Sequence, residues 1–134
     1  MKNRYVEVLE RYMRLLAASD YAAIVELFAP DGRVYSPFLG EMGAAPFFER
    51  LKGASEKNVI TPLDVFVSAR DSNQATAFFR YDWTVTDGTQ ISFEVMDLFE
   101  FADGTDKVRK LTLIYDTHPI RESVGNKYET ALKK

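Results

Sequence analysis

The sequence contains no cysteine and a single histidine, His118. Without cysteine the chain forms no disulfide bond, thiolate nucleophile or thiolate metal site, so redox chemistry at sulfur is excluded. With one imidazole, a metal site would have to consist of oxygen ligands, and no loop of alternating Asp and Asn ligands of the EF-hand kind is present. We therefore expect neither a metal nor a cofactor.

Long apolar runs and clusters of positive charge are also absent. The 134 residues include 17 Lys and Arg against 20 Asp and Glu, for a net charge of −3, and the basic residues are scattered. Nucleic-acid-binding proteins show a basic stripe, whereas membrane spans and signal peptides need a continuous apolar segment. We therefore expect a single-domain cytoplasmic protein, with no nucleic-acid partner and no membrane partner.

The N-terminal part of the sequence shows helical periodicity. Apolar residues at the spacing of one helical face predict helices over residues 3–18, 21–28 and 44–51. The turn residues 30–32 are expected to end the second helix, and a short strand is expected at residues 33–35.

The remainder of the sequence reads as β-structure. Alternating apolar and polar residues predict strands at about 58–70, 75–85, 90–101 and 107–117, separated by hairpin signals such as Asp-Gly. Consecutive hairpins give an antiparallel sheet with the helices gathered on its apolar face. The expected fold class is therefore α+β, a cone-shaped curved antiparallel β-sheet packed against three N-terminal helices and enclosing a cavity.

Asp97 is the most informative residue of the strand predicted at 90–101. Period-2 alternation places its carboxyl group on the same face as Phe93, Val95 and Phe99. Burying an ionised carboxylate without partners costs several kcal/mol or more, so such a group is paired, strongly hydrogen-bonded or kept protonated by a raised pKa. The alternative is a shifted or bulged strand that leaves Asp97 at a wet rim.

The order of these elements, together with residues 27–37 (LFAPDGRVYSP), resembles the ketosteroid isomerase-like and SnoaL-like members of the nuclear transport factor 2 superfamily. The resemblance implies the NTF2-like, or cystatin-like, fold: a single domain over residues 1–118, with residues 119–134 as its C-terminal extension. It also implies a homodimer through the exposed sheet face that carries Phe78, Met96 and Ile114. It leaves the activity open, because the superfamily includes isomerases, dehydratases, epoxide hydrolases, polyketide cyclases and non-catalytic domains.

In ketosteroid isomerases a Tyr of the first helix and an Asp of the next-to-last strand donate hydrogen bonds to the enolate oxygen of the substrate. Tyr12 and Asp97 resemble that pair, and helical spacing places Tyr12 on the buried face of its helix. Either the two side chains form a purely structural hydrogen bond, or they face a ligand. In the second case we expect desolvation to raise the pKa of Asp97 and make it a donor.

Other positions depart from the superfamily's catalytic patterns. The general base of ketosteroid isomerases is an Asp where this chain has Ser36, so the steroid reaction itself is not expected. Epoxide hydrolases need an Arg where this chain has Val95. An Arg-x-Asp motif at Arg80 and Asp82 lies on the predicted polar face, where a solvated ion pair is the simpler interpretation.

His118 and Asp116 follow the last predicted strand, where cyclase-type members place acid–base groups. An imidazole titrates near neutrality, and Asp116 would lie on the same face and orient it. The alternative is a surface or interface histidine. The resemblance therefore gives four candidate catalytic residues: Tyr12, Asp97, His118 and Asp116.

The expected ligand is a small apolar organic compound, uncharged or weakly acidic, with a carbonyl or phenol oxygen. The expected walls contain no Lys or Arg. Two functions follow: an isomerase, cyclase or dehydratase that stabilises an enolate with a base other than Ser36, or a non-catalytic binding or assembly domain. The same aromatic residues also suit a packed core. The expected binding residues are Ser36, Phe47, Phe48, Leu51, Trp83, Phe93, Val95 and Tyr115.

Overall fold

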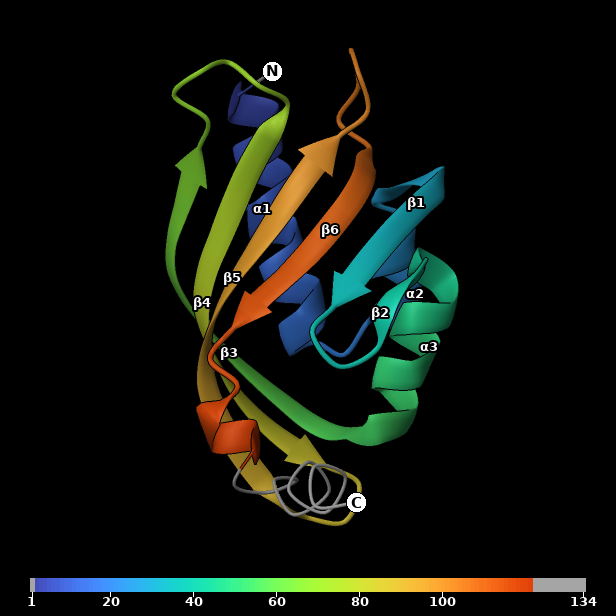
Figure 1. The fold of residues 1–134 in the computed structure, drawn as a ribbon, viewed down its shortest axis with the longest axis vertical. Helices are drawn as coiled ribbons and strands as arrows, with labels where there is room; N and C mark the ends of the chain where they lie inside the picture. Colours follow the sequence, from blue (N-terminus) through green and yellow to red (C-terminus); the bar gives the residue numbers. More distant parts are fainter. Residues whose placement is uncertain (1, 122–134) are drawn as a thin grey trace, which may run out of the picture.

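The computed structural model describes residues 2–121, which form a curved, unclosed sheet with the helices on its concave side (Figure 1). The predicted C-terminal extension lies largely outside the described residues, which end in a helical turn at 118–121. No helix of residues 2–121 is long and apolar enough to cross a membrane. The elements are α1 (Lys2–Ala17), α2 (Tyr21–Val25), β1 (Phe28–Ser36), β2 (Gly40–Gly43), α3 (Ala44–Ala54), β3 (Ser55–Val67), β4 (Gln74–Val85), β5 (Gln90–Phe101) and β6 (Val108–Tyr115).

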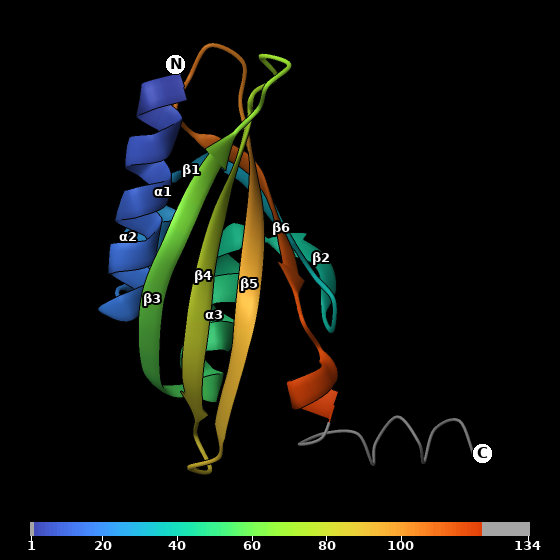
Figure 2. The same ribbon diagram turned by 90° about the vertical axis from the view of Figure 1, so that its left-hand side faces the viewer.

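The six strands form one sheet in the order β2-β1-β6-β5-β4-β3. Neighbouring strands are antiparallel except for β1 and β6, which run parallel. The turned view shows α1 alongside β3, and α3 within the curve of the sheet (Figure 2). The predicted α+β fold with a curved sheet and N-terminal helices is confirmed.

The apolar faces of β4 and β5 form the floor of the core. Alternate residues of both strands are buried, from Ala75 to Tyr81 in β4 and from Ile91 to Phe101 in β5. Their register places Asp97 between Ala77 of β4 and Leu113 of β6. The predicted register of β5 is therefore confirmed, and Asp97 lies on the inner face of a strand with a neighbour on each side.

The structure differs from the sequence prediction between α2 and α3. The second helix ends at Val25, and residues 30–32, expected to be the turn that stops it, lie inside β1 as an irregularity in the pairing with β6. A Cβ atom on Gly32 would lie 2.8 Å from the Phe28 ring, so this backbone approach requires glycine. Strand β2 was not predicted, because its four residues carry no apolar alternation; it pairs with β1 as an edge strand.

Candidate functional site

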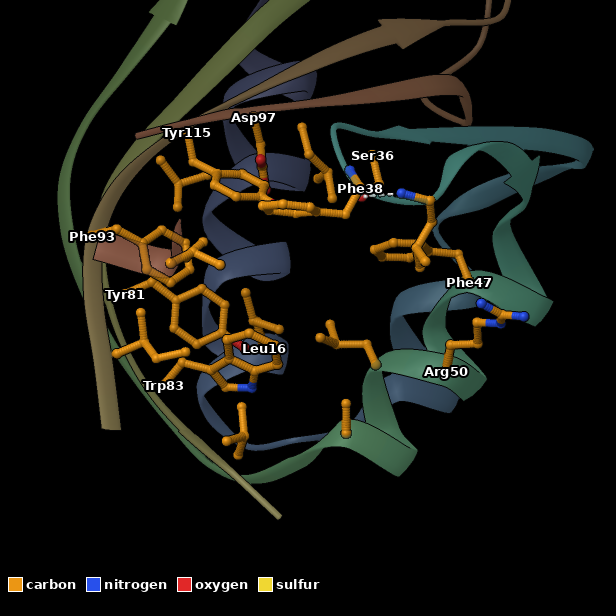
Figure 3. Close-up of a pocket in the computed structure, with 18 of the residues that line it drawn as sticks. Leu16, Ser36, Phe38, Phe47, Arg50, Tyr81, Trp83, Phe93, Asp97 and Tyr115 are labelled. Atoms are coloured by element: carbon orange, nitrogen blue, oxygen red, sulfur yellow. Dashed lines mark hydrogen bonds between the residues drawn. The ribbon is translucent and has the colours of Figure 1, made fainter. Parts of the chain in front are cut away.

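A cavity of about 630 Å³ lies between the concave face of the sheet and helices α1 and α3. Figure 3 shows aromatic side chains of the sheet on one wall and α3 on the other, with Asp97 at one end. Buried lining residues mark the closed part of the cavity, and exposed lining residues such as Leu39, Arg50, Asp87 and Thr89 mark its mouth. The space predicted from the aromatic pattern is therefore hollow rather than filled by side chains.

Tyr12 and Asp97 meet at the closed part of this cavity. The Tyr12 hydroxyl donates a hydrogen bond of 3.0 Å to Oδ2 of Asp97, and both residues line the cavity. Asp97 is 1% exposed, and its other oxygen, Oδ1, has no hydrogen-bond partner among residues 2–121. One carboxyl oxygen is thus fixed by the protein, whereas the second is buried and unpartnered within the described chain.

The surroundings of Asp97 favour its neutral form. Its neighbours on the inner face are Ala77, Leu113 and Val95, none of which stabilises a negative charge. Burial raises the pKa of Asp97 from 3.8 to about 8, and the hydrogen bond from Tyr12 offsets only part of this effect. Since Tyr12 donates to Oδ2, the acid proton at neutral pH belongs on Oδ1.

Tyr12 is held in a fixed position by aromatic packing. Its ring contacts Phe99 edge-on, with centroids 4.9 Å apart, and lies 6.5 Å from the Phe79 ring. Burial, and then the charge of Asp97, raise the pKa of Tyr12 well above its usual value. Tyr12 therefore keeps its proton and serves as a donor.

The polar atoms of two other lining residues point to protein partners. The Tyr81 hydroxyl donates to Oδ1 of buried Asn58, whose amide group in turn donates to Tyr21 and to the main chain of Leu16. The indole nitrogen of Trp83 donates to Ser55 Oγ at 2.8 Å. Tyr81 and Trp83 thus present mainly their ring surfaces to the cavity.

Ser36 lines the cavity at the position where the sequence comparison with ketosteroid isomerases expects a base. Its Oγ accepts hydrogen bonds from the main-chain N–H groups of Phe38 and Leu39, at 3.3 and 3.4 Å. Ser36 therefore stabilises the turn between β1 and β2. A neutral hydroxyl held in this way supplies no general base.

Most of the predicted site residues line one cavity. Tyr12, Asp97 and Ser36 are joined there by six of the predicted wall residues. Phe48 does not line the cavity: it packs in the core against Phe28 and Phe47. The predicted wall residues that do line it are Phe47, Leu51, Trp83, Phe93, Val95 and Tyr115.

His118 and Asp116 are exposed and lie outside the set of lining residues. The Asp116 carboxylate accepts a hydrogen bond of 2.9 Å from the main-chain N–H of His118, at the start of the helical turn 118–121. Ile120, from the same turn, is buried and lines the cavity. The acid–base role of His118 and Asp116 stays a prediction, without a place in the cavity wall.

The expectation of walls without Lys or Arg was wrong at one position. Arg50 lines the mouth, because it follows Phe47 by three residues and precedes Leu51 on α3, and both of these residues also line the cavity. Helical spacing from Phe47 and Leu51 could have indicated this residue. The motif at Arg80 and Asp82 forms an ion pair of 3.3 Å on the outer face, as expected. No group of three His, Asp or Glu side chains in residues 2–121 is arranged to hold a metal ion.

The raised pKa of Asp97 predicts a specific pH dependence of stability. Between about pH 4 and pH 8 the folded protein keeps a proton on Asp97 that the unfolded chain has lost. The stabilisation is complete below about pH 4 and is lost as the pH rises through about 8, with a slope of at most about 1.4 kcal/mol per pH unit. In urea unfolding experiments, Asp97→Asn should remove this part of the pH dependence, because its amide mimics the protonated acid. Parallel curves for the two proteins would show that Asp97 ionises normally.

Comparison with known proteins identifies a matching domain family and several similar structures. The SnoaL-like domain model matches residues 9–109, whereas no curated protein sequence matches the chain. Similar solved structures include a candidate isomerase from Bacillus subtilis, which is 20% identical over 92% of this chain and 94% of its own, with a TM-score of 0.75. AclR, a candidate hydroxylase from Streptomyces galilaeus, is 16% identical over 94% and 98%, with a TM-score of 0.73.

A third similar structure is SalBIII, an epoxide hydrolase/cyclase-like enzyme of pyran ring formation in the polyether salinomycin. It is 19% identical over 86% of this chain and 92% of its own, with a TM-score of 0.70. At these identities the structures show a shared fold and not a shared activity. The family model matches most of the chain, so the chain belongs to the SnoaL-like domain family, and its curved sheet has the NTF2-like fold.

Proposed function

We propose that the protein binds a small hydrophobic carbonyl or phenolic compound in the cavity and stabilises its enolate or enol form through Tyr12 and Asp97. The observation that carries this proposal is that Asp97 lines the cavity and that its Oδ1 atom is buried without a hydrogen-bond partner among residues 2–121. A polar atom in that situation costs about 1–3 kcal/mol when it stays unsatisfied, so a ligand oxygen that accepts its proton is favoured.

The two side chains have different roles in this proposal. Asp97, neutral at pH 7, donates its proton to the ligand oxygen, and this hydrogen bond strengthens as negative charge develops there. Tyr12 donates to Oδ2 and so fixes the orientation of the carboxyl group. The surrounding apolar walls exclude water, which increases the effect of a single donor.

The cavity suits a small, mainly apolar ligand. Its volume of about 630 Å³ lies within the range of small-molecule sites. Phe93, Tyr81 and Trp83 present aromatic surfaces along one wall, and the ring centroid of Tyr81 lies 5.3 Å from that of Phe93 and 6.0 Å from that of Trp83. The descriptions of the structural neighbours as an isomerase, a hydroxylase and a cyclase-like enzyme agree with chemistry at such a ligand.

A second candidate function, binding without catalysis, is favoured by Ser36. Its hydroxyl oxygen accepts two main-chain hydrogen bonds at the position of the missing base. A protein of this kind would polarise a ligand oxygen without removing a proton from carbon. Binding and turnover therefore need separate tests.

For binding, we predict that the protein prefers 1-tetralone to its hydrocarbon analogue tetralin by about three- to tenfold, the effect of one neutral hydrogen bond. Equilibrium dialysis at pH 6.5 measures both affinities. Asp97→Leu should abolish the preference while retaining the binding of tetralin. In the unmodified protein, the preference should also decline as the pH rises through about 8, because an ionised Asp97 cannot donate to a ketone. Equal affinities at pH 6.5 would contradict the proposed orientation of the ligand.

For catalysis, we predict little or no 3-oxosteroid isomerisation by the unmodified protein. A general base contributes about 10²–10⁴-fold, and none stands at position 36. Ser36→Asp should increase any trace rate at least about tenfold, since a carboxylate there retains acceptors for the N–H groups of Phe38 and Leu39. Ser36→Asn, which fits the same turn without a base, serves as the control. Vigorous activity of the unmodified protein would show that the base lies elsewhere.

The outer face of the sheet supports the further proposal of a homodimer. Phe78, Met96 and Ile114 pair side by side across β4, β5 and β6, and Met96 and Ile114 are 39% and 52% exposed. An apolar row of this kind on an open sheet face suits a second copy of the same face related by a two-fold axis.

We predict that light scattering at micromolar concentration gives twice the chain mass of 15.3 kDa. Ile114→Arg should give the monomer mass, because a charge would be buried at the interface. Leu63→Arg, at a residue of similar exposure on edge strand β3, should leave the dimer intact. A monomer for the unmodified protein would rule out this interface.

A further inference from the structure

Arg50 occupies an unusual position for a charged residue. It lies on the stripe of α3 that faces the cavity, together with Phe47, Leu51 and Ala54, at helical spacing. Among residues 2–121 it is the lining residue with a positive charge; the other ionisable lining groups are acids or phenols. The side chain is exposed and starts on α3, across the cavity from Trp83, with its guanidinium group directed toward the outside in this view (Figure 3).

The guanidinium group of Arg50 has no acidic partner within the described part of the chain. Its helical neighbours explain this, because the residues three and four positions away are Phe47, Pro46, Gly53 and Ala54. Some exposed arginines have acidic partners, such as Arg80 with Asp82 and Arg109 with Glu100, whereas Arg11, Arg14 and Arg70 have none among residues 2–121; Arg50 differs from these three in lining the cavity. A positive charge at the cavity mouth is therefore available to a ligand.

The acidic residue at the mouth does not neutralise this charge. The Asp87 carboxylate accepts a hydrogen bond of 2.9 Å from the main-chain N–H of Thr89, in the turn between β4 and β5. Hydrogen bonds from Thr89 lower the pKa of Asp87, so this group stays ionised in its own turn. It forms no ion pair with Arg50 within residues 2–121.

We propose that Arg50 determines specificity, and that the ligand is a carboxylic acid whose carboxylate binds Arg50 at the mouth while its carbonyl or phenol oxygen binds Asp97 at the closed end. This inference rests on the proposed function, which places the ligand oxygen on Asp97. It narrows the ligand class to elongated oxo- or hydroxyaryl-carboxylic acids with an apolar middle.

Under this proposal, the affinity of a carboxylic acid for the cavity depends on its length. Arg50 is exposed, so a carboxylate that reaches it stays hydrated and gains about three- to fivefold in affinity, as expected for a solvent-exposed ion pair. A shorter acid, with its oxygen on Asp97, would place its carboxylate among apolar walls such as Phe93 and Leu51. It would then bind more weakly than a neutral analogue, because that charge loses its hydration.

The experiment compares two acids with their neutral carboxamides: 4-hydroxybenzoate and 4′-hydroxybiphenyl-4-carboxylate. Dissociation constants are measured by calorimetry at low salt for the unmodified protein, Arg50→Met and Lys52→Met. Methionine retains an apolar stem without the charge. Lys52 is an exposed cation of α3 outside the set of lining residues, so its variant controls for net charge.

We expect the long acid to bind about three- to fivefold more tightly than its amide in the unmodified protein and in Lys52→Met, and this ratio to fall to about one in Arg50→Met. The short acid should bind more weakly than its amide. Added salt should reduce the advantage of the long acid.

Two results would overturn the role of Arg50: equal affinities of the long acid and its amide in the unmodified protein, or an equal loss of preference in Lys52→Met. In either case, a preference for 1-tetralone over tetralin that depends on Asp97 would leave the proposed function standing. Failure of that preference as well would overturn both proposals.

Discussion

The burial of the Asp97 carboxyl group is the constraint on which the arrangement of the cavity depends. It lies on the inner face of the sheet, 1% exposed, with apolar neighbours on both adjacent strands. An ionised group there would lose its hydration and gain only the hydrogen bond from Tyr12, so burial favours the neutral acid. Helix α1 and strand β5 are joined at this point, and the hydrogen bond that joins them also fixes the orientation of the carboxyl group.

Selectivity follows from how few polar atoms face the closed part of the cavity. Tyr81 and Trp83 carry groups that could compete for a ligand oxygen, but Asn58 and Ser55 accept their hydrogen bonds. Asn58 also donates to the end of α1, so the network that removes these competing groups also anchors the helix that carries Tyr12. Under the proposed function, Asp97 is therefore the donor that remains for a ligand oxygen in the closed part of the cavity.

Local periodicity placed Tyr12 and Asp97 on the apolar faces of long, regular elements, and the resemblance to ketosteroid isomerases implied that the two side chains meet. Between residues 26 and 43 periodicity was insufficient. The backbone at Pro30 to Gly32 is determined by pairing with β6, a partner distant in sequence, and β2 has no apolar pattern of its own. Arg50 was missed because charged residues are usually expected to face solvent. The aliphatic part of an arginine side chain can nevertheless lie along the apolar stripe of its helix.

Asp97 can act as a proton donor, whereas Ser36 cannot act as a base. This difference limits the reactions that the cavity could support. A neutral acid donor binds an oxygen more strongly as that oxygen gains negative charge, so the site favours enol, enolate and phenolate forms over ketones. At position 36 the hydroxyl oxygen accepts two main-chain hydrogen bonds and removes no proton from carbon. Under the proposed function, the site thus stabilises an enolate but does not remove the proton that forms it. A compound that already carries an acidic phenol or an enolised carbonyl needs only this stabilisation, so we propose such compounds as the ligands.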